Sequence, residues 1–157
     1  MKGIEPCLWF DDQAEQAAKF YTSTIKNSKI DKISYYGMEG PGEKGKVMTV
    51  TFQLNGQDFM ALNGGPIFKF TPAISLFVNC ENQEEVDGLW EKLSEGGEKG
   101  QCGWLTDKYG ISWQIVPTIL GELMVDKDAK KVERVMHAML QMTKMDIAKL
   151  KMAYDQG

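Results

Sequence analysis

Reactive side chains are few and widely spaced in this sequence of 157 residues. His137 is its only histidine, so a Ser-His-Asp or Cys-His catalytic arrangement would have to use it, and no G-x-S-x-G motif accompanies it. The cysteines Cys7, Cys80 and Cys102 form no C-x-x-C pair, which indicates reduced thiols and not a disulfide framework. A metal site with two histidines is excluded, and no catalytic motif stands out.

Large aromatic side chains are concentrated on segments that are predicted to be strands. Aromatic residues on strands usually pack in a core. On the concave face of a curved sheet they would also suit the wall of a pocket, because ligand pockets are mostly apolar and aromatic. Both interpretations apply to Trp9, Tyr35, Tyr36, Trp104 and Trp113.

A glycine-rich stretch imitates part of a phosphate-binding loop. Gly40 and Gly45-Lys46 have the right spacing, but Val47 stands where a Ser or Thr should hold magnesium. A strand is predicted where a helix N-terminus should receive the phosphate. No G-x-G-x-x-G joins a strand to a helix, so neither a dinucleotide nor S-adenosylmethionine has a predicted site. We interpret 37–45 as a connecting loop.

Composition indicates an ordinary globular protein, with 43% apolar and 25% charged residues. The 18 basic and 22 acidic residues leave a net charge of −4, which offers no excess of positive charge for nucleic-acid binding. No stretch approaches the ~20 apolar residues of a membrane span, and the N-terminus has no apolar signal region. We therefore predict a cytoplasmic protein without membrane or nucleic-acid partners.

The first part of the chain has the pattern of a strand, a helix and three strands. Alternating residues predict a strand over 4–10, and Asp12 with Glu15 three positions later predicts the cap of the following helix. Strands are expected at 32–36, 47–54 and 57–62. Asn55-Gly56 predicts a tight hairpin between the last two, because both positions tolerate positive φ. The first module is thus expected to span 1–66.

The same order of elements begins again after Gly64-Gly65-Pro66. Ile74, Leu76 and Val78 predict a strand, and Asn82 with Glu85 predicts a capped helix. Segments 103–106 and 111–116 then predict a hairpin. A repeated helix-then-hairpin order favours a mixed sheet in an α+β fold, with the second module over 67–117.

The last segment, 118–157, is predicted to be a helical tail in two pieces. One helix is expected over 127–140, and a second is expected to begin at a cap formed by Thr143 with Asp146 three positions later. The methionines of this tail are expected to pack in its core or in a dimer contact, although they would also suit an adaptable binding surface.

Three segments carry a resemblance to a known family. They are EPCLWFDDQAEQAAKFY (5–21), CGWLTDKYGISWQIVP (102–117) and RVMHAMLQMTKMDI (134–147). The sequence resembles the PhnB-like branch of the glyoxalase, or vicinal oxygen chelate, superfamily, which is often labelled demethylubiquinone 3-methyltransferase-like. The resemblance implies two tandem βαβββ modules that form an open curved mixed sheet, and a homodimer, often with exchanged strands or modules.

The resemblance also implies where a divalent metal would bind in relatives that need one. The matching positions are Pro6, Met60, Ile74 or Ser75, and Gln114. Only Gln114 among them has a suitable donor, and Glu5 would help only in a register shifted by one residue, which would turn it to the other face. Because catalytic sites usually use about three protein ligands, we expect no metal and no cofactor.

These observations favour a metal-free small-molecule binding protein with a pocket in the sheet cavity. The alternatives that stay open are an enzyme of the same superfamily (lyase, dioxygenase or methyltransferase-like), metal-free acid-base chemistry at Asp107, Tyr109 or Cys102, and a protein that acts through its tail surface. The expected polar contacts of the pocket are Cys7, Ser75, Ser112 and Gln114, and its expected walls are Trp9, Tyr35, Met60, Trp104 and Trp113.

Overall fold

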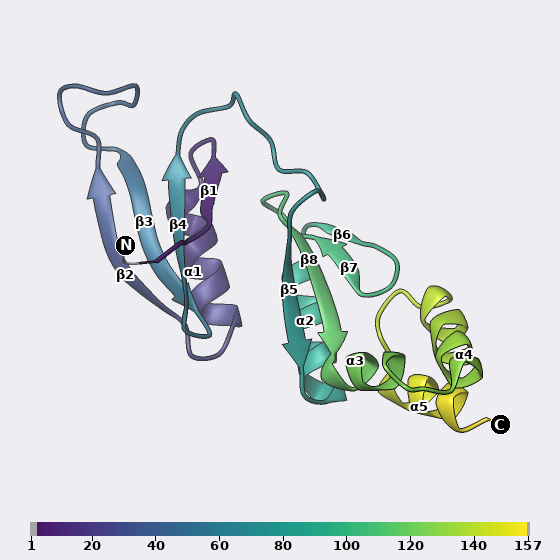
Figure 1. The fold of residues 1–157 in the computed structure, drawn as a ribbon. Coiled ribbons are helices and arrows are strands. Elements are labelled where there is room, and N and C mark those ends of the chain that lie inside the picture. The colour runs from purple at the N-terminus through teal and green to yellow at the C-terminus, as the bar shows by residue number, and fades with distance from the viewer. Residues whose placement is uncertain (1–2, 157) are drawn as a thin grey trace. The chain divides into compact units, whose positions relative to one another are not determined.

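The chain folds into two compact units that divide between Phe70 and Thr71. The computed structural model describes residues 3–156 (Figure 1). Each unit contains one four-stranded mixed sheet with a helix against it. The predicted α+β fold of two tandem βαβββ modules with a helical C-terminus is confirmed.

The first unit has its parallel strand pair at one edge of the sheet. The strand order is β1-β4-β3-β2, with β1 parallel to β4 and the other neighbours antiparallel. The helix α1 packs on one face, where Tyr21, Val50 and Phe52 are buried. The elements are β1 (Cys7–Phe10), α1 (Ala14–Thr24), β2 (Lys29–Tyr35), β3 (Val47–Leu54) and β4 (Gln57–Asn63).

The hairpin between β3 and β4 is confirmed. Asn55 and Gly56 have φ of 47° and 82°, and Leu54 pairs with Gln57 directly across the turn. Two consecutive left-handed residues match the twist of the strands, which is why this dipeptide is favoured there.

The predicted cap of α1 is wrong. Gln13, not Asp12, is the N-cap residue, and its side chain makes no capping hydrogen bond. Instead, the Ala14 N–H donates to Asn63 Oδ1 at 2.8 Å, and Asn63 Nδ2 donates to the carbonyl of Val47 at 3.1 Å. A side chain from the far end of β4 therefore satisfies the free helix donor.

The second unit repeats this topology. Its strand order is β5-β8-β7-β6, with β5 parallel to β8, and the short strand β6 is an addition to the predicted hairpin. The predicted helix cap is confirmed: Asn82 Oδ1 accepts from Glu85 N–H at 2.9 Å, and Glu85 Oε2 accepts from Glu81 N–H at 2.9 Å. The elements are β5 (Ser75–Cys80), α2 (Gln83–Ser94), β6 (Glu98–Lys99), β7 (Trp104–Thr106) and β8 (Ser112–Pro117).

Both parallel strands begin later than predicted. The first starts at Cys7 and the second at Ser75. Ile4 and Ile74, which were expected on the buried faces of these strands, are 88% and 79% exposed. Alternating apolar residues alone do not make a strand where no neighbouring strand supplies hydrogen bonds.

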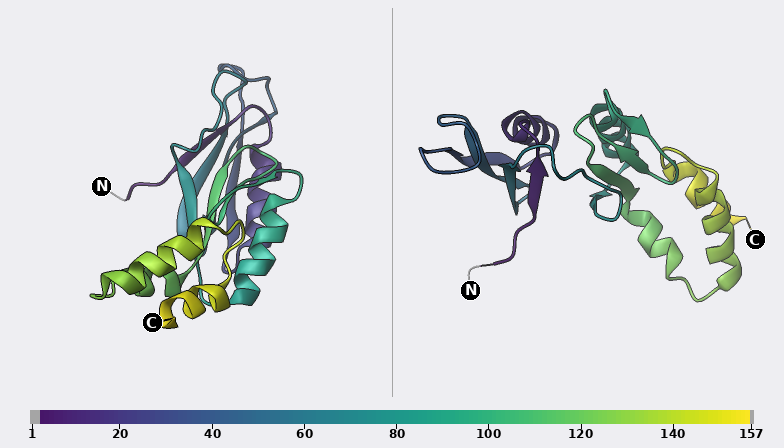
Figure 2. Two further views of the ribbon diagram at one scale, coloured as in Figure 1. Left: turned by 90° about the vertical axis from the view of Figure 1, so that its right-hand side faces the viewer. Right: turned by 90° about the horizontal axis from the view of Figure 1, so that it is seen from above.

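The helical tail has three helices and belongs to the second unit. The helix α3 was not predicted, and Asp146, not Thr143, caps the last helix by accepting from Lys149 N–H at 3.0 Å. The helices α4 and α5 lie against each other (Figure 2). The tail elements are α3 (Thr118–Met124), α4 (Ala129–Leu140) and α5 (Ile147–Asp155).

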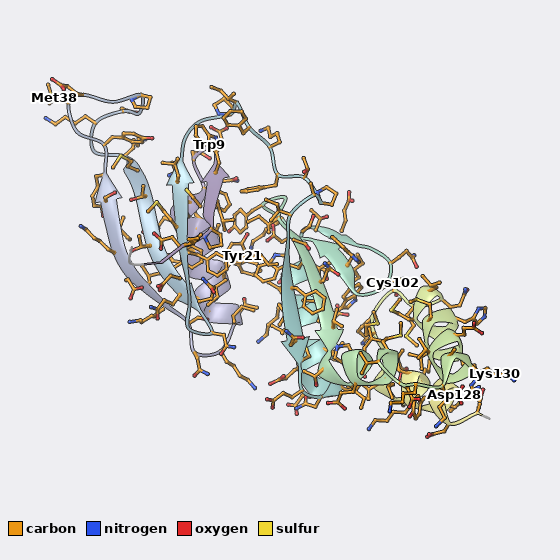
Figure 3. All side chains as sticks on the ribbon, viewed as in Figure 1. Trp9, Tyr21, Met38, Cys102, Asp128 and Lys130 are labelled. Carbon is orange, nitrogen blue, oxygen red and sulfur yellow. The ribbon has the colours of Figure 1, made fainter. Side chains whose placement is uncertain are left out.

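Backbone hydrogen bonds tie the tail to the turn before β7. The N–H groups of Cys102 and Gly103 donate to the carbonyls of Met142 and Thr143 at 2.8 and 2.7 Å. Figure 3 shows Cys102 next to the tail. Gln83 of α2 adds two bonds, donating to the carbonyl of Met145 at 3.0 Å and accepting from Ile147 N–H at 2.9 Å.

The tail methionines divide between core and surface. Met142 and Met145 are buried, as expected for core residues, whereas Met136 and Met152 are exposed. In the described part of the chain, every helix is too short or too polar to cross a bilayer.

Candidate functional site

The sheet of the second unit has one open face, opposite α2, that carries polar side chains in register. Residues on a strand alternate between the two faces, and residues paired across strands share a face. Two neighbouring rows result on the open face. One row contains Glu98, Thr106, Ser112 and Ser75, and the other contains Trp104, Gln114 and Phe77.

A cavity of about 370 Å³ lies in the first unit and one of about 220 Å³ lies on this open face. Ser112 lines the smaller cavity and is only 4% exposed, yet its hydroxyl has no hydrogen-bond partner among the described residues. Every fully buried side-chain N or O atom of those residues has a partner, so the Ser112 hydroxyl must be reached from the cavity. The lining residues are Pro72, Glu98, Lys99, Gly100, Trp104, Leu105, Thr106 and Ser112.

Four predicted site residues come together here. Trp104 and Ser112 line the cavity, and Gln114 lies beside Trp104 in the cross-strand register. Gln114 Nε2 donates to Ser75 Oγ at 2.9 Å, so these two side chains hold each other in place. The predicted polar contacts of the second module thus share one face with an aromatic wall.

Trp113, which was predicted as a pocket wall, does not lie with this group. It lies on the other side of β8, is 2% exposed, and packs in the row of Leu76 and Leu105. Its indole N–H donates to Asp107 Oδ2 at 2.8 Å. The physical reason is the period of two along a strand, which separates Trp113 from both Ser112 and Gln114.

The candidate acid-base residues Asp107, Tyr109 and Cys102 lie around strand β7, where their contacts are with the protein itself. Asp107 is buried and Oδ1 accepts from the N–H groups of Tyr109 and Ile111 at 2.8 and 3.1 Å. Burial and the nearby charge of Asp107 raise the pKa of Tyr109, which disfavours its phenolate. Cys102 Sγ donates to the carbonyl of Met139 at 3.6 Å. Asp107 thus holds the β7–β8 turn, whereas Cys102 lies in the turn before β7 and contacts the tail.

The site residues predicted in the first module divide into a group and one outlier. Cys7 pairs with Met60, and Trp9 lies two residues further on the same face, opposite α1. Trp9 (labelled in Figure 3) donates its indole N–H to the carbonyl of Gly65 at 2.9 Å. Tyr35 is 58% exposed on β2, at the other edge of the sheet, so it does not lie with them.

The Cys7 thiol has a raised pKa, caused first by burial and then by the charge of Glu5. A raised pKa lowers the fraction of thiolate at neutral pH, and the thiolate is the reactive form. Cys7 is exposed on the open face, and this environment does not favour it as a nucleophile.

The larger cavity, in the first unit, was not predicted. It lies where β1 ends and α1 begins, under the loop that follows β2, and Tyr36 closes one side with its hydroxyl donating to the carbonyl of Asn63. The sequence pattern here predicted only a helix cap at Asp12, with no sign of a cavity. The lining residues are Asp11, Asp12, Glu15, Gln16, Tyr36, Pro41, Gly42, Glu43, Lys46, Val47, Asn63, Gly64 and Gly65.

The residues at the metal positions of the superfamily do not fit a divalent ion. Pro6 offers only a carbonyl, which accepts from Met60 N–H at 2.9 Å, and Met60 offers a thioether. Ser75 and Gln114 are bonded to each other. A bound divalent ion usually needs about three protein donors, and the side chains at these positions supply only the Gln114 amide and the Ser75 hydroxyl. Among the described residues, no group of three or more His, Cys, Asp or Glu is placed to bind a metal.

Comparisons with known proteins agree with this fold. A PhnB protein from Bacillus cereus is 42% identical, with a TM-score of 0.69 over 74% of this chain and 100% of its own. A Pseudomonas aeruginosa protein is 20% identical, with a TM-score of 0.64 over 74% of this chain and 98% of its own. The fosfomycin resistance protein FosX of Listeria monocytogenes, solved with Mn(II) and sulfate, is 18% identical, with a TM-score of 0.51 over 72% of this chain and 89% of its own.

No curated protein matches the chain significantly. A sequence model of a protein family does match: residues 2–116 fit the family described as 3-demethylubiquinone-9 3-methyltransferase. This match covers both modules and stops before the helical tail. The chain therefore belongs to the 3-demethylubiquinone-9 3-methyltransferase family, the PhnB-like branch of the vicinal oxygen chelate superfamily.

Proposed function

We propose that this protein binds a small organic molecule, without a metal, in the cavity on the open face of its second sheet. The observation that carries the proposal is the Ser112 hydroxyl, which is buried, has no partner among the described residues and lines that cavity. The hydroxyl is open to the cavity, so a polar atom of a ligand there could bond to it in place of water, and such a bond contributes about 1 kcal/mol.

The surroundings of Ser112 support this function. Trp104 supplies an aromatic surface next to it, and Thr106 adds a second hydroxyl from the neighbouring strand. Gln114, held by Ser75, lies in the adjacent row. Apolar walls with a few fixed polar groups are the usual composition of a small-molecule site.

The test is a binding screen with the full-length protein and variants of the cavity. A metabolite panel is first screened by thermal shift, and the binding constant of each hit is then compared in Ser112→Ala and Trp104→Leu. We expect at least one hit, weakened roughly ten-fold by Ser112→Ala through the loss of one hydrogen bond. Ser23→Ala, on the exposed surface of α1, is the matched control.

Ser112→Ala is a clean variant because it removes no protein hydrogen bond. We expect its free energy of unfolding to stay within about 0.5 kcal/mol of the parent protein. The proposal is wrong if the panel gives no hit, or if all hits bind Ser112→Ala and Trp104→Leu as tightly as the parent.

Metal analysis of the purified protein gives an independent test. We expect far less than one equivalent of any divalent cation, because the donors at the superfamily positions do not fit one. One equivalent of tightly bound cation that is lost on replacing Gln114 by Ala would contradict the metal-free function.

We also propose that the protein is a homodimer, with or without exchanged strands, in the cytoplasm. In each sheet the parallel strand, β1 or β5, lies at an edge with a neighbour on one side only, and such edges offer backbone groups for pairing. The free thiols Cys7, Cys80 and Cys102 agree with a reducing compartment. Light scattering coupled to gel filtration tests the dimer, and a monomeric mass over the micromolar range would refute it.

A further inference from the structure

We infer that the cavity of the second unit selects a small organic cation, namely a primary ammonium group on a single apolar ring. This inference rests on the proposed function and adds the chemical class of the ligand. The cavity offers three features for such a ligand: a carboxylate without a counter-ion, two hydroxyl acceptors in register with that carboxylate, and an aromatic surface for the ring.

The unbalanced charge at the cavity is negative. Glu98 lines the cavity, is exposed, and makes no ion pair with another described residue. The other charged lining residue, Lys99, is neutralised, because its Nζ contacts both carboxylate oxygens of Glu91 at 3.0 and 2.8 Å. A cation entering this site meets a free carboxylate, whereas an anion meets repulsion.

The polar atoms of the cavity suit an ammonium group as acceptors. Glu98 pairs with Thr106, and Thr106 pairs with Ser112, so the three side chains follow one another on strands about 4.8 Å apart. An ammonium group has three donors and no acceptor. One carboxylate and two hydroxyl oxygens can accept these three donors, and one of them is the Ser112 oxygen that has no partner.

The size and the apolar wall limit the rest of the ligand. An apolar cavity of about 150 Å³ in a protein core accommodates benzene. The cavity of about 220 Å³ therefore has room for one ring with a short polar arm. Trp104 borders it beside Pro72 and Leu105, and the face of a tryptophan attracts a nearby cation in addition to packing against a ring.

Three compounds of nearly equal shape test this inference: benzylammonium, benzyl alcohol and benzoate. Each is titrated at low salt into ¹⁵N-labelled full-length protein, and the signals of the Trp104 indole and the Ser112 amide are followed. We expect benzylammonium to bind roughly two- to five-fold more tightly than benzyl alcohol, and benzoate to bind most weakly. Added salt should reduce the advantage of the cation.

A charge-neutral variant isolates the carboxylate. Glu98→Gln keeps the shape of the side chain and should remove most of the difference between benzylammonium and benzyl alcohol. Glu95→Gln is the control, because Glu95 is also exposed but does not line the cavity. The inference fails if Glu98→Gln leaves the preference unchanged, or if the two variants behave alike.

The outcomes separate the ligand class from the proposed function. If benzyl alcohol or benzoate shifts the Trp104 and Ser112 signals at lower concentration than benzylammonium, the cavity binds ligands but the cation selectivity is refuted. If none of the three compounds shifts either signal at millimolar concentration, the inference is refuted. The proposed function is then also refuted if the metabolite panel gives no hit that depends on Ser112.

Discussion

Replacing Asp107 should destabilise the second unit strongly, because three donors depend on its carboxylate. Asp107 accepts from the backbone N–H groups of Tyr109 and Ile111 and from the Trp113 indole. The last two bonds are buried, and a buried donor left without a partner is unfavourable by about 1–3 kcal/mol. For two such donors we expect Asp107→Ala to lower the free energy of unfolding by about 4 kcal/mol.

The asparagine variant separates charge from geometry. In Asp107→Asn one oxygen still accepts from the two backbone donors, but the new NH₂ group faces the Trp113 indole N–H, and two donors cannot bond to each other. We expect a loss of about 2 kcal/mol. Trp113→Phe in the Asn background should then cost less than in the parent protein, because the unfavourable donor pair is gone.

Urea unfolding measures these changes, with the signal of Trp90, a buried residue of α2 that all variants keep, as a probe of the second unit. Asp155→Ala is the control, since Asp155 is exposed at the end of α5 and should change stability by less than about 0.5 kcal/mol. A loss below about 1 kcal/mol for Asp107→Ala would refute the assignment of the turn's stability to this carboxylate.

Three further predictions follow from local contacts. Asn82→Ala should lower the free energy of unfolding, measured with urea, by about 1 kcal/mol, and Asp12→Ala by less than half as much. The reason is that Asn82 caps a helix and Asp12 does not, so equal losses would contradict this prediction. Burial, and then the charge of Glu85, raise the pKa of Cys80 from 9.0 to about 11, so the unfolded chain loses this proton first and stability should fall as pH rises from about 9 to about 11. Thermal melts would show a smaller fall in Cys80→Ala, and an identical fall would refute the thiol as its source. Gln83→Ala should lower the free energy of unfolding by about 2 kcal/mol, because the two bonds from Gln83 to the tail are lost. Amide hydrogen exchange should then increase more in α5 than in α2, and an equal increase in both helices would contradict the prediction.

Features that depend on a few adjacent residues could be predicted from the sequence. The Asn55-Gly56 turn needs only the backbone freedom of its own two residues, and the Asn82 cap needs only a donor three positions later. The repeated order of strand, helix and strands therefore indicated the fold before any tertiary contact was known. Within the site, Ser75, Trp104, Ser112 and Gln114 were expected as pocket residues from their residue types, and the structure places them on one face of the second sheet.

Features that depend on distant residues could not be predicted. The donor at the start of α1 is satisfied by Asn63, which is 49 positions away, and no local pattern reveals that bond. Trp113 was expected in the pocket because its residue type suits a wall, but the face of the strand decides its position. The cavity of the first unit needs the loop between β2 and β3 to lie beside Asp11, which is also a tertiary arrangement.

The backbone around Trp104 is fixed before any ligand arrives. Its N–H donates to the carbonyl of Gln101, and its carbonyl accepts from Gly100 N–H. The preceding Gly103 is bonded both to Thr143 of the tail and to Ile115 of β8. A binding wall anchored in this way loses little conformational entropy on association. The tail, which lies outside the part that matches the family, would then act as a brace that improves affinity without touching the bound molecule.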